Sequence, residues 1–521
     1  MSTPVNGGVR KGLVLAIACA AVVLLTVDLT VLHLAIPKLT SDLDPSATQI
    51  LWIADIYGFV LAGLLITMGS VGDRIGRKKL LLIGTVAFGA ASLLTAYAPN
   101  AEMLMVARVL LGAAGATIMP STLSILRNVF TDPKERTAAI GLWSGMSASG
   151  FVLGPIIGGA LLNHFWWGSV FLINIPILLV LFIAALVFLP ESSNPVPGRL
   201  DLLSVVLSTG GVIGLVYAVK EAAHEGIAEP AALGAGLAGL AAITLFVVRQ
   251  TKLEHPLIDV RLFRRAAFTG AVTANMFAMF AMVAQSLIFA QYFQLVLGWS
   301  PLTAGLAGLP GAAASAIGGG ALAAPMISAI GRAKTVGIGL GLGAIGLALY
   351  TTAGMESNYL MLVVAMVPVG IGFGMAFAVT GDTVLATVPK ERAGSGAAIS
   401  ETAMEVGGAL GIAVLGSALN SAYTKGVELP DGVPAPVVPV IEDSIAAAAH
   451  VAATLPAELA AQVMEAARHA FVDAFHVSAL VAAGVMGLVA LVSLATLRGV
   501  PKVIEDEQPG DESVQAYSSA H

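Results

Sequence analysis

Charged residues are scarce in this chain of 521 residues, since only 11% are Asp, Glu, Lys or Arg while 57% are hydrophobic. Soluble domains carry about a quarter charged residues, so the composition argues against a soluble globular protein. Disorder over the bulk of the chain is also excluded, because disordered segments combine low hydrophobicity with high charge. The composition therefore predicts a chain that lies mostly in a membrane.

Cysteine is nearly absent, with Cys19 the single one. One thiol allows no disulfide within the chain and no cysteine cluster for a metal, and the eight histidines form no catalytic or metal-binding grouping. No phosphate-binding Walker loop occurs, and no basic patch alternates with aromatic residues. The sequence thus disfavours an enzyme, an ATP-driven pump and a nucleic-acid-binding protein, and we expect neither a metal nor a cofactor.

Long apolar runs fill most of the chain, and fourteen of them can cross a bilayer, which takes about 20 residues. A membrane β-barrel would show short alternating segments instead, so the expected fold class is an all-α membrane protein with 14 transmembrane helices. The run that follows Lys11 is too long for a signal peptide and has no small-residue cleavage site. We expect it to remain as the first span.

Basic residues gather on one side of the membrane when the spans are threaded in order. They follow the even-numbered spans, whereas the opposite side holds only four: Lys38, Lys220, Lys425 and Arg468. The positive-inside rule then places both termini in the cytoplasm of a multi-pass protein of the cell (inner or plasma) membrane.

Residues 422–470 form a segment that is too long for an ordinary connection between spans. A proline-rich stretch over residues 429–439 leads into an alanine-rich helical pattern that breaks at Pro456. We predict a short helical hairpin on the external face.

Carboxylates inside apolar runs are the sharpest functional signal, because a charge at the bilayer centre costs about 2.5–3.5 kcal/mol on insertion scales and usually marks an ion or substrate path. Four stand out: Asp28, Asp55, Glu401 and Glu405. Glu401 and Glu405 share one helix face, and two such neighbours in a low dielectric cannot both ionise cheaply. Glu405 is favoured as a group that exchanges a proton for a cation, whereas Asp55 lies near enough to a span end to be simply solvated.

Two further charged residues have competing interpretations. Arg108 is the one basic residue expected deep inside a span, where it needs a partner or a wet cavity. It either biases the proton affinity of a nearby carboxylate or makes a structural ion pair. Asp382 lies near the end of its span and fits a possible gate or helix-end role as well as a transport role.

The loop between the second and third spans, residues 69–79, combines glycines with charges of both signs. Glycine permits a tight turn, and the charges can bridge neighbouring helix ends. Its expected conformational residues are Gly69, Gly72, Asp73, Arg74, Gly76 and Arg77.

The fifth span carries a second glycine-rich pattern over residues 150–159. Small residues permit close contact between helices, and a proline within a helix kinks it. The expected conformational residues are Gly150, Gly154, Pro155, Gly158 and Gly159.

These segments resemble known transporter motifs. Residues 69–79 resemble the signature loop of the major facilitator superfamily, and residues 104–112, with Arg108, resemble the motif that the family uses for proton coupling. Residues 150–159 resemble the antiporter motif of its drug exporters.

Three other segments narrow the resemblance. Residues 25–37, with Asp28, resemble the first-span motif of the fourteen-span drug:proton antiporters. Residues 52–57 and 399–407 are similar to the Qac-type multidrug exporters of quaternary ammonium compounds. The acidic pair in the thirteenth span hints at cationic substrates.

The resemblance implies two six-helix bundles around a central cavity that opens alternately to the two sides of the membrane. The expected divisions are a cytoplasmic N-terminus (1–11), an N-terminal bundle (12–190), two inserted helices (201–250), a C-terminal bundle (267–498) that includes the 422–470 hairpin, and a cytoplasmic tail (499–521).

The resemblance also implies a function. The chain is expected to export lipophilic, mostly cationic drugs and antiseptics in exchange for protons, as a monomer driven by the proton gradient. Asp28, Arg108 and Asp55 would couple protons, and the substrate would meet Asp28, Asp55, Tyr57, Glu401 and Glu405. The alternatives are a dedicated exporter of one natural product or antibiotic, an importer, which the span-5 motif disfavours, and a membrane-embedded enzyme.

Overall fold

The computed structural model describes residues 7–193, 200–224, 229–254, 256–356, 358–502 and 504. This part of the chain is helical and contains no strand, which confirms the all-α class. The α-helices are α1 (Gly7–Leu43), α2 (Ala47–Ile75), α3 (Arg77–Ala96), α4 (Ala101–Val129), α5 (Pro133–His164), α6 (Ser169–Leu172), α7 (Asn174–Phe188), α8 (Leu202–His224), α9 (Pro230–Gln250), α10 (Ala266–Gln291), α11 (Pro301–Ala307), α12 (Leu309–Ile317), α13 (Ala323–Ile330), α14 (Arg332–Leu349), α15 (Tyr359–Ala386), α16 (Ala393–Gly426), α17 (Val438–Asp443), α18 (Ile445–Ala452) and α19 (Ala457–Thr496).

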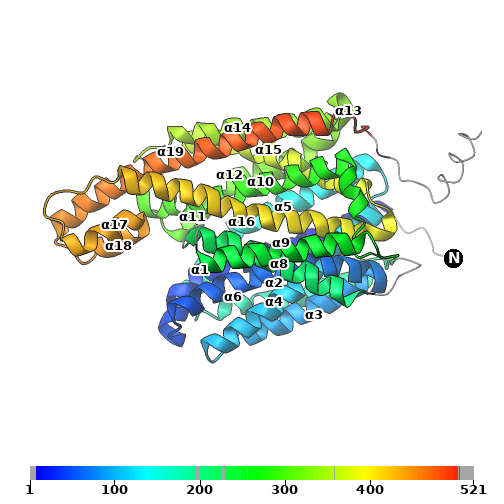
Figure 1. Ribbon diagram of the computed structural model, residues 1–521, viewed down its shortest axis with the longest axis horizontal. Coiled ribbons are helices and arrows are strands. Elements are labelled where there is room, and N and C mark those ends of the chain that lie inside the picture. The colour runs from blue at the N-terminus through cyan, green and yellow to red at the C-terminus, as the bar shows by residue number, and fades with distance from the viewer. Residues whose placement is uncertain are drawn as a thin grey trace, which may run out of the picture.

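The long helices run along the long axis of the molecule (Figure 1). Fourteen helical stretches in the described residues are long and apolar enough to cross a membrane, the number expected from the sequence. Large apolar side chains cover the outer faces, and Val180, Leu237 and Leu360 are 69%, 70% and 74% exposed. Water would not tolerate so extensive an apolar surface, whereas lipid does, so this is a multi-pass membrane protein.

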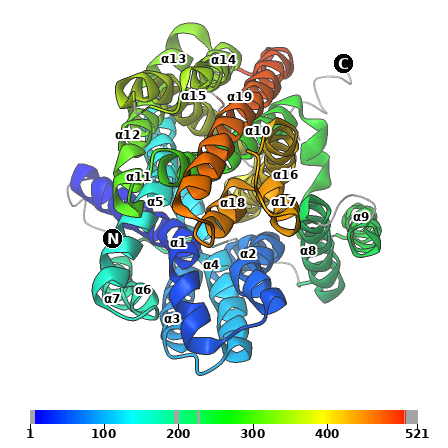
Figure 2. The same ribbon diagram turned by 90° about the vertical axis from the view of Figure 1, so that its left-hand side faces the viewer.

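Two large clusters of buried apolar residues hold the helices together. One comes mainly from the N-terminal half, α1–α7, and the other from the C-terminal half, α10–α19. Two smaller clusters link α2 to the inserted helices and to the C-terminal half. Seen end-on in Figure 2, the two sets of helices lie beside each other, with α8 and α9 at one side. The candidate functional residues lie on helices of both halves.

Helices α8 and α9 pack against each other, and α8 also lies against α2 and α16. Arg249 fastens the pair by donating from Nε to Oδ2 of Asp201 at 2.6 Å and from its terminal nitrogen to Oδ1 at 2.9 Å. These bonds hold the pKa of the Asp201 carboxyl well below its usual range. The contact with α2 and α16 brings α8 close to the candidate site.

One of the fourteen apolar runs, residues 302–330, is divided into α11, α12, a π-helical turn at Gly318–Leu322 and α13. Pro310 stands in the first turn of α12, where a proline favours a new helix start. At the π-helical turn, neighbouring backbones approach closely. A Cβ atom on Gly319 would lie 2.7 Å from the carbonyl oxygen of Gly141 in α5, and one on Gly318 would lie 2.3 Å from that of Ile371 in α15.

The end of the molecule that carries α17 and α18, at the left of Figure 1, is called the hairpin end here, and the end that carries residues 69–79 is called the motif end. Tyr423 Oη donates to the carbonyl of Ile441 at 3.0 Å, which ties α17 to α16. The alanine-rich part of the expected 422–470 hairpin forms α18, and the chain beyond Pro456 is the beginning of α19. The last span therefore starts earlier than its apolar run at residue 471.

Candidate functional site

Asp28 lies at the centre of a buried polar cluster in the N-terminal half. Its Oδ1 accepts a hydrogen bond of 2.8 Å from Asn174 Nδ2, and its Oδ2 is 3.5 Å from a terminal nitrogen of Arg108. The Arg108 guanidinium lies over the ring of Tyr57, 4.6 Å from its centroid, and its Nε donates to the carbonyl of Ile53 at 3.2 Å. The structure thus brings together Asp28, Arg108 and Tyr57, three residues predicted for the site.

This ion pair is incompletely hydrogen-bonded. Asp28 Oδ2, one Arg108 terminal nitrogen and Tyr57 Oη are buried and make no hydrogen bond to any described residue. A buried charge pair stabilises a protein only with close geometry and further hydrogen bonds, and neither condition is met on this side of Asp28. Asn174 consequently holds Oδ1 of the carboxylate, whereas Oδ2 is free to exchange Arg108 for another partner.

Asn174 was missed by the sequence reasoning. It opens α7 and donates both to Asp28 and, at 3.2 Å, to Ser92 Oγ of α3. The available signal was a single amide side chain at the start of a strongly apolar run, and an amide is less conspicuous there than a charge because it costs less to bury.

Asp55 lies apart from Asp28 and pairs with Lys220 of α8. Both side chains are about one third exposed, at 32% and 30%. The Lys220 ammonium also lies 5.1 Å from the centroid of the Phe59 ring. The alternative of simple solvation therefore gives way to an ion pair with an inserted helix. The sequence placed Lys220 among the four basic residues on the opposite side and did not point to this pairing.

Glu401 and Glu405 occupy successive turns of α16, as the spacing predicts. Glu401 is 4% exposed. It lines a small cavity of about 20 Å³, which is room for about one water molecule. Asn275 and Ser400, joined by a hydrogen bond of 2.9 Å, line the same cavity.

Glu405 connects the two halves electrostatically. It is close enough to interact with Lys220 and with Tyr57, and Arg108 likewise interacts with Asp28 and Asp55. Four carboxylates, Asp28, Asp55, Glu401 and Glu405, are thus gathered around two cations, Arg108 and Lys220. The fully ionised set carries a net charge of −2, which favours binding of a cation or of protons.

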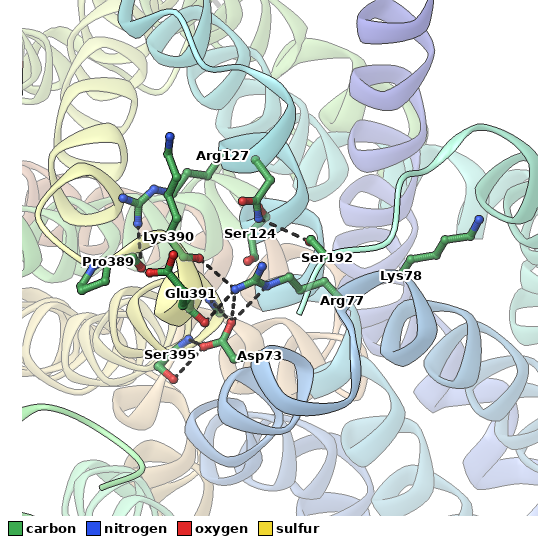
Figure 3. A network of polar contacts seen from close by, with 12 residues as sticks. Asp73, Arg77, Lys78, Ser124, Arg127, Ser192, Pro389, Lys390, Glu391 and Ser395 are labelled. Atoms are coloured by element: carbon green, nitrogen blue, oxygen red, sulfur yellow. Dashed lines mark hydrogen bonds and ion pairs between the residues drawn. The ribbon is translucent and has the colours of Figure 1, made fainter. Parts of the chain in front are cut away.

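The predicted conformational loop covers the end of α2 and the start of α3, and its side chains bind residues of the C-terminal half (Figure 3). Asp73 accepts from the backbone N–H groups of Gly394 at 2.8 Å and Ser395 at 2.9 Å, and from Ser395 Oγ at 3.0 Å. These donors form the first turn of α16, where a carboxylate is favoured by the free N–H groups and by the helix dipole. Asp73 of the N-terminal half therefore caps the N-terminus of α16 in the C-terminal half.

Arg77 completes this contact, which we call the Asp73 latch. It donates to Asp73 Oδ1 at 3.1 and 2.8 Å, and to the carbonyls of Lys390 and Glu391, both at 2.9 Å. The turn that presents Arg77 needs glycine, because Gly76 has φ +110°.

The other loop residues have smaller parts in the latch. Gly69 permits the close approach to α16, since its Cβ would lie 2.4 Å from the carbonyl oxygen of Gly394. Gly72 packs against Leu80, and one terminal nitrogen of Arg74 is buried without a hydrogen bond to a described residue.

The 150–159 pattern forms the contact face between α5 and α1. Added Cβ atoms would lie 2.5 Å from Thr26 Cβ at Gly150, 1.9 Å from Thr30 Oγ1 at Gly154 and 2.6 Å from Val31 Cγ2 at Gly158. Gly159 differs, because a Cβ there would meet no atom within 4 Å. Glycine is thus sterically required along one face of α5, which packs against the helix that carries Asp28.

Asp382 joins the halves at a second place. It lies in α15 between Arg136 of α5, at 2.5 Å, and Arg332 of α14, at 2.7 Å, and all three side chains are at most 2% exposed. We call this trio the Asp382 latch. Two guanidinium groups share one carboxylate, so the latch carries one excess positive charge.

A cavity of about 220 Å³ lies elsewhere. It is lined by α10, α11, α12, α15 and their connections, together with Ala148 and Pro155 of α5. Pro155 is the single residue of the predicted set that lines it. The four carboxylates are absent from its lining, so the polar cluster and this cavity are distinct features.

The family model of the major facilitator superfamily matches residues 18–412. The chain belongs to the major facilitator superfamily. Within this superfamily, it is 42% identical over 491 residues to the multidrug efflux pump LfrA of Mycolicibacterium smegmatis, which covers 94% of this chain and 97% of that protein. It is 36% identical over 492 residues to the methyl viologen resistance protein SmvA of Salmonella typhimurium, covering 93% and 98%.

A third relative is the tetracenomycin C resistance and export protein of Streptomyces glaucescens, 30% identical over 528 residues, with 99% and 97% coverage. Among solved structures, the human organic anion transporter MFSD10 superposes with a TM-score of 0.61 over 94% of this chain and 100% of that one, at 13% identity. This superposition shows the shared major facilitator fold. Together, the relatives identify this major facilitator protein as a membrane transporter.

Proposed function

We propose that this protein is a proton-coupled antiporter that exports lipophilic, mostly cationic drugs and antiseptics, including quaternary ammonium compounds and dyes. Two relatives that match nearly the whole chain support this proposal, because one is named a multidrug efflux pump and the other a methyl viologen resistance protein. Methyl viologen is an organic dication, so its export by this chain is part of the proposal.

The observation that carries the proposal is the carboxylate cluster shared by the two halves. An organic cation with a delocalised charge loses little hydration on leaving water, and a carboxylate can meet that charge inside the protein. Asp28 and Glu405, held beside Arg108, Tyr57 and Lys220, can bind either a cation or a proton. A proton and a substrate cation then compete for the same negative charges, which is the basis of exchange.

Each predicted residue receives a role in this scheme. Asp28 and Asp55 exchange protons, and Arg108 sets the charge around Asp28. The substrate cation meets Asp28, Asp55, Glu401 and Glu405, and the Tyr57 ring can hold it through a cation–π contact. In this conformation Arg108 occupies that ring face, so substrate binding would require Arg108 to move aside.

The two latches are proposed to close the cytoplasmic side during alternating access. Both connect the halves near the motif end, through Asp73 to α16 and through Asp382 to Arg136. With the termini in the cytoplasm, this conformation is closed to the cytoplasm. The glycine face of α5 would let α1 and α5 move as one unit, since the two backbones are in close contact.

The remaining expectations complete the scheme. Transport by a monomer is driven by the proton gradient and requires no cofactor. The protein lies in the cell membrane with both termini in the cytoplasm, and the segment 422–470 lies outside.

Everted membrane vesicles that contain the protein test the proposal. Ethidium should be taken up into them when respiration makes their interior acidic, and a protonophore should abolish the uptake. Inhibiting ATP synthesis while respiration continues should leave uptake intact. Uptake that survives the protonophore would remove proton coupling from the proposal, and failure to transport any lipophilic cation would remove the substrate class.

A dedicated exporter of one natural product is the second candidate, and the relative named a tetracenomycin C resistance and export protein favours it. A susceptibility panel in a host that lacks its own pumps separates the two candidates. Protection against a single antibiotic class, with no change for quaternary ammonium compounds, would favour the dedicated exporter.

A further inference from the structure

The cavity of about 220 Å³ in the C-terminal half has a lining without any charged side chain. It lies between α10, α12 and α15, where α5 of the other half closes one wall, on the side of the molecule away from α8 and α9 (Figure 2). A charged ligand would find no counter-ion there and would remain uncompensated in an apolar site. The cavity is therefore unsuited to the cations assigned to the carboxylate cluster.

Four aromatic rings line this cavity, those of Phe289, Phe293, Tyr350 and Phe373. Phe289 meets Tyr350 edge-on at a centroid distance of 4.5 Å and stacks on Phe293 at 5.4 Å, and Phe373 and Met366 come from α15. Aromatic side chains favour other rings in offset-stacked or edge-to-face geometry. The shape and chemistry of the cavity thus fit a planar aromatic ligand.

Gln285 is one of several uncharged polar residues in this lining, which also includes Gln294, Ser286 and Ser315. Its side chain is 5% exposed, yet neither its amide nitrogen nor its amide oxygen makes a hydrogen bond to any described residue. Buried amides nearly always have partners, because an unmet donor or acceptor loses its hydration without compensation. The amide therefore offers one donor and one acceptor that a ligand can satisfy together.

We propose that this cavity is a binding site for uncharged aromatic compounds of about two fused rings that carry a hydrogen-bond donor beside an acceptor, with Gln285 as their polar anchor. The volume supports this size, because an apolar cavity of about 150 Å³ accepts benzene. The proposal concerns neutral ligands and a site separate from Asp28 and Glu405, so it goes beyond the proposed export of cations and does not depend on it.

2-Naphthamide is a suitable probe, since it has two fused rings, no charge and a carboxamide that can pair with the Gln285 amide. Its equilibrium binding is measured on the full-length protein in lipid nanodiscs, without transport. Wild type should bind it saturably, and Gln285→Leu should weaken binding about tenfold, as expected for the loss of a buried polar pair. 2-Ethylnaphthalene has the same two rings without the carboxamide, and it should bind the variant at least as well as it binds wild type.

A matched control makes the result decisive. Gln291→Leu changes an exposed glutamine on the same helix and should leave naphthamide binding unchanged. Cooperative thermal unfolding reports the fold of each variant, and Gln285→Met replaces Gln285→Leu if the latter does not fold. The proposal is overturned if folded wild type shows no saturable naphthamide binding, if both Gln285 variants bind it like wild type, or if Gln291→Leu weakens it as much as Gln285→Leu does.

Discussion

At the scale of single residues, the buried groups divide into those with complete hydrogen bonding and those without it. Asp73 is buried with five donor atoms around its two oxygens, whereas Asp28 has a hydrogen bond on one oxygen and a distant cation on the other. A fully bonded carboxylate holds a structure in place. An incompletely bonded one is free to exchange a partner, and this difference separates the expected structural role of Asp73 from the expected chemical role of Asp28.

Asp28→Asn should abolish cation export while the protein still reaches the membrane in normal amount. The amide keeps the bond with Asn174 in reach but removes the negative charge, so it leaves Arg108 buried without its counter-ion, a loss that costs about 3–5 kcal/mol for a buried pair. Vesicle transport normalised to membrane protein measures the effect. Wild-type export by this variant would rule out Asp28 as a coupling residue.

Substitutions of Arg108 distinguish its two interpretations. If Arg108 tunes Asp28 by charge alone, Lys should restore part of the activity that Ala loses. If its planar geometry over Tyr57 and toward Ile53 is required, Lys should fail like Ala, because an ammonium does not reproduce a guanidinium. Full export by both variants would reject both interpretations.

Neutralising Glu405 should harm a dication more than a monocation. A second positive charge needs a second carboxylate, and Glu405 is the group that faces Lys220 and Tyr57 from the other half. For Glu405→Gln we expect resistance to methyl viologen to fall at least tenfold more than resistance to ethidium.

Glu401→Gln serves as the companion variant on the same helix face, and we expect it to show the same preference. Equal losses for the two substrates in both variants would remove α16 from cation recognition and assign the pair to a gate.

Much of this residue pattern could be predicted from the sequence, because a charge in an apolar run is conspicuous. Asp28, Arg108 and the acidic pair were found in this way. Asn174 and Gln285 were not, since a neutral amide is a weak signal, and Gln285 becomes notable when the absence of its partners is known. The partner of Asp73 could not be predicted at all, because the backbone N–H groups of residues 394 and 395 have no signature in the sequence.

At the scale of elements, the close contact of α1 with α5 positions the site, since α1 carries Asp28. The sequence predicted a small-residue face on α5 but could not name the helix that packs against it. Gly159 illustrates the limit, because it belongs to the same sequence pattern and yet lies away from the contact. Likewise, Pro310 and the glycines at 318–320 mark the irregular part of the run 302–330, but no local pattern names α5 and α15 as the helices that approach it.

Gly154→Ala should therefore reduce export strongly, whereas Gly159→Ala should not. The new methyl group at residue 154 would overlap Thr30 Oγ1, and relief requires α1 and α5 to separate, at a cost of about 1–3 kcal/mol. Thermal stability in detergent and dye efflux should both fall for the first variant alone. Similar behaviour of the two alanine variants would contradict the assigned packing face.

Helix α8 brings an ammonium group to the carboxylate cluster. Lys220 pairs with Asp55 in this conformation, so a substrate cation that uses Asp55 must displace it. For Lys220→Met we expect a lower KM for methyl viologen, by about threefold to tenfold, because the tethered competitor is gone. An unchanged or higher KM in a well-expressed variant would show that Lys220 does not compete with substrate.

At the scale of the whole molecule, the two halves are fastened at the motif end by latches of different character. The Asp73 latch balances its charge with Arg77 and helix donors, whereas the Asp382 latch holds two guanidinium groups on one carboxylate. Opening this end exposes the buried charges to water, which lowers the free energy needed to separate them. The two latches are thus suited to stabilising a closed state reversibly.

Asp73→Asn should shift the protein toward the state that is open at the motif end. A cysteine in place of Ser144, which lines the small cavity between the halves, should then react faster with a water-soluble maleimide added from the motif side. We expect the rate to rise severalfold over the Ser144→Cys parent. The same rate in both would show that Asp73 does not control closure.

The position of α8 gives the molecule two unlike sides toward the bilayer. One seam between the halves, along α2 and α16, is covered by α8, and no further helix among the described residues covers the seam along α5 and α12 (Figure 2). A lipophilic compound that diffuses within one leaflet of the bilayer thus meets one seam that α8 covers and one that it does not. Lateral entry into the protein would therefore be favoured from one side, because of a pair of helices that a symmetric two-bundle carrier does not have.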